Sequence, residues 1–194
     1  MSLNIFKNYL SQHQFSANDI ALLCEHASLI ELPTSHVFIH QGQNPQYAYF
    51  LQSGLCHASY LTAAGEEIGK SFFWEEDWII GFESLITQAP NPYLLESLTD
   101  VSVVQIPLDL LQEWREQTNP LYMRLLEMEW LLKEQKERFQ LFYSAQERYQ
   151  LFQQQFPYLL EQISNKRLAD YLGTNEQALL EMKQAFLDDS HRKP

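Results

Sequence analysis

The chain is poor in cysteine, glycine and positive charge. Its 194 residues include two cysteines, six glycines, and 13 Lys and Arg against 25 Asp and Glu. Cys24 and Cys56 have no CxxC spacing, and they are too few to hold an iron–sulfur cluster by themselves. The N-terminus is neither basic nor continuously apolar, so it does not resemble a secretion signal. These features predict reduced thiols and a cytoplasmic location.

Long apolar runs are also missing. No run of about 18 apolar residues occurs, so we expect no membrane-spanning helix. The acidity is unevenly distributed, with seven Lys and Arg against 18 Asp and Glu in residues 1–138, but six against seven in residues 139–194. Neither part carries the strongly basic footprint that is typical of a nucleic-acid-binding surface.

Short, β-rich segments follow one another between residues 33 and 106. Turns at Gly42, Gly54 and Gly65 help to separate them at a spacing of about ten residues. This pattern predicts a small barrel or a double sheet. Elsewhere the apolar positions follow helical spacing, and we expect helices at 3–9, 20–27, 108–117, 120–142, 148–155 and 176–187.

The helix expected at 120–142 carries a seven-residue repeat. Asn119-Pro120 gives it a start, because proline is well tolerated in the first helical turn. The repeat forms a narrow seam of Leu121, Leu125, Met128, Leu132, Gln135, Phe139 and Phe142. Such a seam predicts a dimer interface, in which Gln135 would meet its own copy if the helices pair in parallel. The alternative is a core helix packed on its own domain, which Leu126, Trp130 and Leu131 favour because they lie off the seam.

The segment from Trp78 to Leu98 interrupts the rhythm of strands. A glycine, a short helical turn and a proline-rich loop come in succession. Irregular segments held on a rigid scaffold often form ligand sites. The candidate ligand-binding residues are Gly81, Glu83, Ser84, Asn91 and Tyr93. The alternative is a simple connection, in which these residues serve turn formation and packing.

The C-terminal part has the spacing of a helix-turn-helix. Ser144 and Glu147 form a capping-box pattern that begins one helix. Further on, a short helix around Ala169, a glycine turn at Gly173 and a last helix follow one another. Two helices joined by a glycine turn also occur in plain helical packing, which is the alternative.

The order of these parts resembles the Crp/Fnr family of bacterial regulators, typified by the cyclic-AMP receptor protein. The resemblance covers nearly the whole chain. It rests on the three turn glycines, Gly81-Phe-Glu-Ser-Leu85, Asn119-Pro120, Ser144-Ala-Gln-Glu-Arg148-Tyr149, Phe156-Pro157 and Leu168-Ala-Asp-Tyr-Leu-Gly173.

The resemblance implies an α+β fold in three parts. A cyclic-nucleotide-binding-type β-roll, which is a double-stranded β-helix, would occupy residues 1–118 with its flanking helices. A dimerisation helix would occupy residues 119–143, and a small winged helix-turn-helix domain residues 144–194. The chain stops soon after the last helix, so we expect the wing to be short or missing.

The expected ligand element departs from the family pattern. Nucleotide-binding members hold the cyclic phosphate with an Arg-Ser pair, which here falls near Pro92 and Tyr93. The matching stretch, residues 88–95, contains no arginine or lysine. A buried phosphate needs a cationic partner. We therefore do not expect cyclic AMP to bind in the usual way, and we expect no cofactor. Another small-molecule effector, or none, is the expectation.

The expected recognition helix departs from the pattern as well. Glu176, Gln177 and Glu181 take the positions where family members use arginine and glutamate to read bases. Two carboxylates would be repelled by DNA phosphates. The candidate DNA-binding residues are Lys166, Arg167, Thr174, Asn175, Gln177 and Lys183, and Arg192 and Lys193 are further nearby cations.

Catalysis has little support in the sequence. No Ser-His-Asp or Cys-His group stands in a known motif, and no phosphate-binding glycine loop occurs. His36, His40 and His57 raise the alternative of a cupin-type metal site, but His36 and His40 would lie far apart along a strand. We therefore expect neither an enzyme nor a metal site.

The sequence thus predicts a dimeric Crp/Fnr-type transcription regulator, whose β-roll senses something other than cyclic AMP. The alternative is a dimeric sensor or adaptor of the same fold that has lost sequence-specific DNA binding. The expected partners are a second copy of the chain, DNA and an unidentified small-molecule effector, with no membrane.

Overall fold

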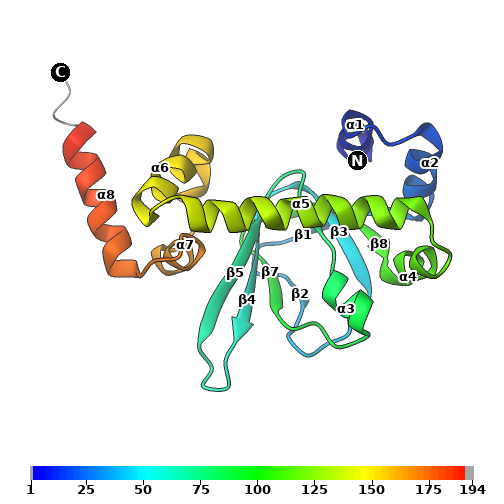
Figure 1. Cartoon of the computed structure of the whole chain (residues 1–194), viewed down its shortest axis with the longest axis horizontal. Coiled ribbons are helices and arrows are strands. Elements are labelled where there is room, and N and C mark those ends of the chain that lie inside the picture. Colours follow the sequence, from blue (N-terminus) through cyan, green and yellow to red (C-terminus); the bar gives the residue numbers. More distant parts are fainter. Residues whose placement is uncertain (1, 191–194) are drawn as a thin grey trace.

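The computed structural model describes residues 2–190, with the side chains described up to residue 186. It is an α+β structure with a β-roll, a long helix across it, and a group of helices at the C-terminal end (Figure 1). In chain order the elements are α1 (Asn4–Gln12), α2 (Ala17–His26), β1 (Ser28–Leu32), β2 (Val37–Ile39), β3 (Tyr47–Ser53), β4 (Cys56–Leu61), β5 (Glu67–Phe73), β6 (Trp78–Ile79), α3 (Phe82–Thr87), β7 (Leu94–Ser97), β8 (Val101–Pro107), α4 (Leu108–Glu116), α5 (Pro120–Phe142), α6 (Ala145–Gln155), the 3₁₀ helix η1 (Pro157–Leu159), α7 (Asn165–Tyr171) and α8 (Glu176–Ser190).

The strands form two four-stranded antiparallel sheets. One has the order β1-β8-β3-β6 and the other β2-β7-β4-β5. The sequence had not predicted β1, because apolar and polar residues do not alternate clearly along Ser28–Leu32. In the structure, all five of its residues are at least partly exposed. Between the sheets, one part of the space is filled by a core that includes Leu51, Ala58, Leu95 and Val103.

Helices cover the outer face of the first sheet. Phe6 and Leu10 of α1 join Phe50, Val104 and Ile106 of the sheet in one continuous core. All five side chains are fully buried. At about 25 cal/mol for each Å² of apolar surface removed from water, this burial is a main source of stability for the β-roll and the helices on it.

The long helix α5 begins with a cap. The Asn119 side chain accepts a hydrogen bond from the backbone N–H of Leu121 at 2.9 Å, and Pro120 occupies the first turn. Leu121 and Leu125 are buried in the chain's own core. Beyond them, α5 runs from the β-roll to the C-terminal helices (Figure 1).

The C-terminal helices pack on one another and also on the β-roll. Their core includes Tyr149, Phe152 and Leu168, and it is continuous with Leu55 and Phe72 of the β-roll. The interface between α7 and β5 is close, since the backbone N–H of Gly69 donates to the carboxylate of Asp170 at 3.3 Å.

A buried arginine holds the turn between α5 and α6 against the end of α7. The guanidinium of Arg148 donates to the carbonyl oxygens of Gln140, Tyr143 and Leu172 at 2.6, 2.5 and 2.8 Å. Gly173, which follows α7, has φ +63, and a Cβ there would lie 2.8 Å from the Gln140 side chain. This position therefore favours glycine.

Among residues 2–190, no helix combines the length and the apolar character that crossing a bilayer requires.

Candidate functional site

The loop after α3 is held in place by backbone hydrogen bonds. Gln88 ends the helix in the left-handed region at φ 58. Asn91 then donates its backbone N–H to the carbonyl oxygen of Gln43 at 2.7 Å. Its side-chain amide is buried and donates to the carbonyl oxygen of Tyr93. The loop is thus fixed against the turn that follows β2.

A cavity of about 470 Å³ lies beside this loop, and we call it the helix-side cavity. Its walls come from β5, α3, the loop and α5. Its lining residues include all five candidates from the sequence, Gly81, Glu83, Ser84, Asn91 and Tyr93. The fold therefore brings the predicted ligand-binding residues around one space of a size that is common for small-molecule sites.

Two lysines that the sequence had not suggested also line this cavity. Lys70 comes from β5 and Lys133 from α5. The ammonium of Lys70 lies 4.7 Å from the centre of the Tyr93 ring, within the range of a cation–π interaction. Burial lowers the pKa of Lys70, and the charges of Lys133 and Lys136 lower it further.

Acidic and hydroxyl groups complete the lining. Glu83 and Glu129 oppose the lysines in charge, and each raises the pKa of Lys70. Burial raises the pKa of Glu129. The Ser84 hydroxyl is buried and has no hydrogen-bond partner among the described residues. A buried polar group without a partner is destabilising unless a ligand or water satisfies it.

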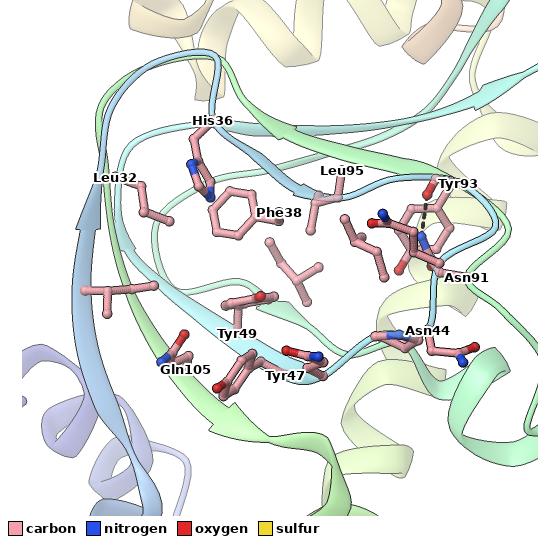
Figure 2. A pocket seen from close by; sticks show the side chains of 17 residues that line it. Leu32, His36, Phe38, Asn44, Tyr47, Tyr49, Asn91, Tyr93, Leu95 and Gln105 are labelled. Atoms are coloured by element: carbon pink, nitrogen blue, oxygen red, sulfur yellow. Dashed lines mark hydrogen bonds between the residues drawn. The ribbon is translucent and has the colours of Figure 1, made fainter.

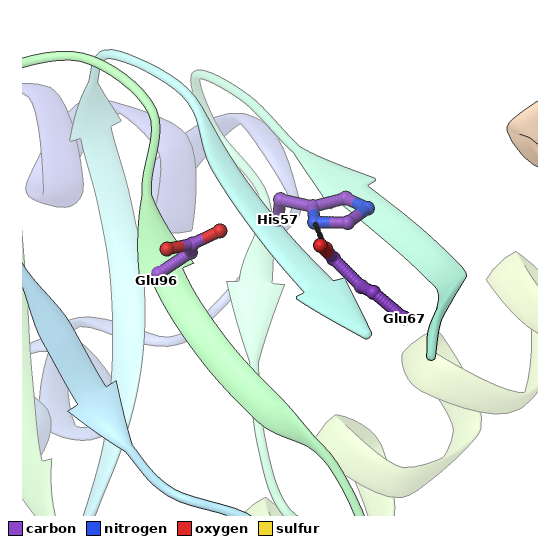
Figure 3. A group of neighbouring side chains, drawn as sticks. All are labelled: His57, Glu67 and Glu96. Carbon is purple, nitrogen blue, oxygen red and sulfur yellow. Dashed lines mark ion pairs between the residues drawn. The ribbon is translucent and has the colours of Figure 1, made fainter. Parts of the chain in front are cut away.

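A second polar cluster joins three strands of the β-roll, β4, β5 and β7, to the C-terminal part. His57, Glu67 and Glu96 each place one ligand-type atom within 4.8 Å of the others (Figure 3). The Nδ1 atom of His57 lies 3.4 Å from a Glu67 oxygen. Burial, and then the charge of Arg167, lower the pKa of His57 to about 4.

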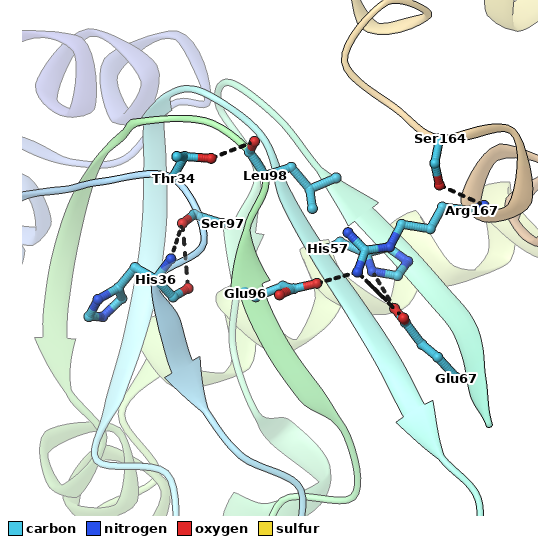
Figure 4. A network of polar contacts seen from close by, with 9 residues as sticks. All are labelled: Thr34, His36, His57, Glu67, Glu96, Ser97, Leu98, Ser164 and Arg167. Carbon is cyan, nitrogen blue, oxygen red and sulfur yellow. Dashed lines mark hydrogen bonds and ion pairs between the residues drawn. The ribbon is translucent and has the colours of Figure 1, made fainter. Parts of the chain in front are cut away.

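Arg167 of α7 supplies a positive charge to this cluster. Its Nη2 atom lies 2.5 Å from an oxygen of Glu96 and 3.2 Å from one of Glu67 (Figure 4). The guanidinium therefore lies between the two carboxylates. We call His57, Glu67, Glu96 and Arg167 the docking cluster.

The candidate DNA-binding residues share one region but not one environment. Lys166, Asn175 and Gln177 are exposed, and Thr174 is partly exposed. Arg167 belongs to the docking cluster, and the ammonium of Lys183 donates to the Asn165 side chain at 2.5 Å. Two of the cations expected to meet DNA are thus paired within the chain. Arg192 and Lys193 lie outside the described residues.

The expected dimer seam is divided between two environments. Leu121 and Leu125 pack in the chain's own core and offer nothing to a partner, because α1 and α4 cover that end of α5. Met128, Leu132 and Phe139 are half-buried, and Gln135 and Phe142 are exposed. Off the seam, Trp130 and Leu131 are 63% and 60% exposed. An exposed apolar surface on α5 therefore exists, and it includes Phe142 of the expected seam together with Trp130 and Leu131 beside it.

Comparison with known proteins identifies the β-roll. Residues 29–118 match the profile of the cyclic nucleotide-binding domain. The c-di-GMP-responsive global regulator CLP of Xanthomonas campestris is similar in structure, with a TM-score of 0.64 and 15% identity, over 90% of this chain and 93% of that chain. FixK2 of Bradyrhizobium japonicum gives a TM-score of 0.64 and 16% identity, over 84% of this chain and 86% of its own.

The sensor domain of the transcriptional regulator DNR of Pseudomonas aeruginosa gives a TM-score of 0.52 and 16% identity, over 70% of this chain and 89% of its own. No curated protein sequence matches the chain significantly. At such identities the likeness concerns the fold. Residues 29–118 thus resemble a cyclic nucleotide-binding domain, and the chain shares its fold with the regulators CLP and FixK2.

Proposed function

We propose that the chain is a dimeric transcription regulator of the Crp/Fnr type, which acts in the cytoplasm and contacts DNA through α7 and α8 as a helix-turn-helix. One observation carries the proposal. The β-roll, α5 and the C-terminal helices follow one another in an order that aligns over 90% of the chain with the regulator CLP. A regulator needs a sensor, an output and a connection between the two. In this proposal the β-roll is the sensor, the C-terminal helices are the output, and α5 connects them.

The effector site in this proposal is the helix-side cavity, and its ligand is a small molecule with an anionic group. Burial is the main cause that lowers the pKa of Lys70, and repulsion by the charges of Lys133 and Lys136 lowers it further. An anion between Lys70 and Lys133 would relieve this repulsion. Cyclic AMP is not the expected ligand in its usual pose, because the Tyr93 ring stands where the family resemblance places the phosphate-binding serine.

Calorimetry with cyclic AMP, inorganic phosphate and citrate as probes tests the effector site. We expect Lys70→Met and Lys133→Met to weaken binding of an anionic probe by about tenfold or more, because a charge-assisted contact is lost. Lys166→Met, which removes an exposed lysine elsewhere, is the matched control. Tight binding of cyclic AMP that neither cavity variant changes would contradict this assignment.

Dimerisation rests on the middle of α5. Trp130 and Leu131 protrude there, and a hollow lies on either side of them. One, of about 820 Å³, lies between α3 and α5. The other, of about 250 Å³, lies between α1 and α5. A ridge flanked by two hollows suits packing against a copy of itself, in which the ridge of one helix fills a hollow of the other.

Light scattering after size exclusion tests the dimer. We expect Trp130→Glu and Leu131→Glu to give monomers, since each would bury an unpaired charge in the interface. Ile5→Glu changes an equally apolar and 45% exposed residue on α1 and should leave the dimer intact. A wild-type protein that is monomeric at micromolar concentration would refute the dimer and weaken the regulator proposal.

DNA binding in this proposal uses the exposed side chains of α7 and the start of α8. A gel shift at low salt with DNA from upstream of the protein's own gene is the direct test. Glu176→Gln and Glu181→Gln should raise non-specific affinity, because each removes a charge that repels phosphate. Lys166→Met should lower it.

The second candidate function is a sensor or adaptor of the same fold without sequence-specific DNA binding. The pairing of Arg167 with Glu67 and Glu96 favours it, because that cation is already neutralised. The absence of any shift at micromolar folded protein, together with no effect of the Glu176 and Glu181 substitutions, would decide for this candidate.

A further inference from the structure

A second cavity lies inside the β-roll, between the inner faces of the two sheets, and we call it the inter-sheet cavity. Its volume is about 530 Å³. Figure 2 shows Tyr49 and Gln105 of the first sheet on one side and Phe38 and Leu95 of the second sheet on the other. Asn91 and Tyr93 stand at one end.

The inner space of the roll is thus filled on one side and open on the other. The packed side holds Leu51, Ala58 and Val103, which are completely buried. In the open side, Leu32, Phe38 and Tyr49 point between the sheets and yet stay partly exposed. Protein interiors are normally packed with few voids larger than a water molecule. An open space this large, walled by inward-pointing aromatic and aliphatic groups, is therefore suited to an occupant.

The lining sets the chemical class of that occupant. None of the described residues that line the cavity is Asp, Glu, Lys or Arg. Its polar groups are side-chain amides, such as Gln105 and Asn91, hydroxyls, such as that of Tyr49, and the imidazole of His36. Burial raises the pKa of Tyr49 to about 12, so this hydroxyl stays neutral. A charged ligand would lose its hydration without gaining a counter-charge.

Aromatic rings shape the cavity. The Phe38 and Tyr49 rings meet edge to face, with centroids 4.9 Å apart. The His36 ring stands at 90° to that of Phe38 at 5.4 Å. Such surfaces favour a flat, aromatic molecule, because aromatic rings attract one another in offset-stacked and edge-to-face arrangements.

We propose that the inter-sheet cavity is a second ligand site, which takes an uncharged aromatic molecule bearing hydrogen-bonding groups. It is separate from the helix-side cavity, although Ile79, Gly81, Asn91 and Tyr93 line both. These four residues form a partition between the two sites. A ligand on one side therefore contacts the wall of the other.

Indole, indole-3-acetate and tryptamine test the charge preference, because they share one ring system and differ in charge. We expect indole to bind wild-type protein with a dissociation constant below about 1 mM in calorimetry or ligand-observed NMR. Both charged analogues should bind at least about tenfold more weakly, because their charges find no partner. Failure of indole to bind, or binding of indole-3-acetate as tight as that of indole, would overturn the proposal.

Substitutions in each cavity test where indole binds. Gln105→Glu places a carboxylate in the cavity and should weaken indole about tenfold while improving tryptamine. Leu32→Trp, at a partly exposed position, should fill the space and also weaken indole, which keeps the test valid if one variant misfolds. Lys133→Met changes the helix-side cavity alone and should leave indole binding unchanged. Indole binding that survives in a folded Gln105→Glu or Leu32→Trp protein, or that Lys133→Met abolishes, would refute the site.

Discussion

Removal of Arg167 tests the attachment of the C-terminal helices to the β-roll. Arg167→Met leaves the carboxylates of Glu67 and Glu96 facing each other without the cation between them. The side chains of Arg167, Glu67 and Glu96 are 25%, 30% and 18% exposed. The pairs thus lie between exposed ones, which contribute about 0–1 kcal/mol, and buried ones, whose disruption costs about 3–5 kcal/mol. We expect a loss of about 2–3 kcal/mol.

A double-mutant cycle measures the contribution of one pair. Arg167→Met, Glu96→Gln and the double variant are compared by urea unfolding followed by circular dichroism. In a separate thermal unfolding experiment, Arg167→Met should lower the Tm of a chain of this length by about 5–10 °C. The coupling energy between Arg167 and Glu96 should be about 2 kcal/mol, because the 2.5 Å contact is charge-assisted. Lys166→Met, on the neighbouring exposed residue, is the control.

Hydrogen exchange distinguishes undocking from general unfolding. The amide of Gly69 donates to Asp170 across the same interface. In Arg167→Met this amide should exchange faster, while the amide of Phe50, inside the first sheet, should lose protection only to the extent of global destabilisation. A coupling energy below about 0.5 kcal/mol, or an unchanged Gly69 amide, would refute the docking cluster as a stabilising contact.

Three further predictions concern pH, backbone and capping. Burial lowers the pKa of His57 in the folded protein to about 4, so the free energy of unfolding should fall as the pH falls from 6.5 through 4. His57→Gln should reduce this pH-dependent loss of stability by about 3 kcal/mol, as measured by urea titrations at a series of pH values. Gly54→Ala should lower the free energy of unfolding by about 2 kcal/mol or more, since Gly54 has φ +95 and an added Cβ would lie 2.8 Å from the Val101 side chain. Gly42→Ala should lower it by about 1 kcal/mol, because Gly42 also has positive φ but has open space around it. Ser144→Ala removes the capping box of α6 and should lower stability by about 1 kcal/mol.

Local signals in the sequence predicted local structure well. Gly42, Gly54 and Gly65 all have positive φ and lie in turns beside strands, as their spacing indicated. The Ser144 cap formed as a capping box, and the Asn119 cap also formed. These features depend on residues a few positions apart, so a single sequence contains all the information that they need.

The chemistry of the cavity could not be predicted in the same way. The expectation of a site without cations considered residues 88–95, which indeed contain none. Lys70 and Lys133 are 63 positions apart in the chain, and they share a cavity because β5 and α5 both border it. Neither strand alternation nor a heptad pattern encodes that neighbourhood. The docking cluster was missed for the same reason, since Arg167 and Glu67 meet through tertiary packing.

The heptad in α5 shows a different limit, because a repeat predicts a face and does not say what covers it. Leu121 and Leu125 have the spacing of a dimer seam and pack on the chain's own helices. Trp130 and Leu131 lie off that seam and are exposed. Sequence periodicity is the same for a helix that packs within a chain and for one that packs between chains.

Strand β5 borders the helix-side cavity and also contacts α5 and α7. Lys70 points to the helix-side cavity, while its neighbours make contacts away from it. The Ser71 hydroxyl accepts from the ammonium of Lys136 on α5 at 2.9 Å, and the Phe72 ring lies 5.3 Å from that of Tyr171 on α7. Successive residues of a regular strand alternate between its faces, but the pairing of β4 with β5 shifts register at Lys70, which lies between the paired residues Gly69 and Ser71. In the proposed regulator, a ligand that draws Lys70 into the cavity would therefore act on a strand whose next two residues contact α5 and α7. In that proposal the cavity is connected to the C-terminal helices through β5 as well as along α5.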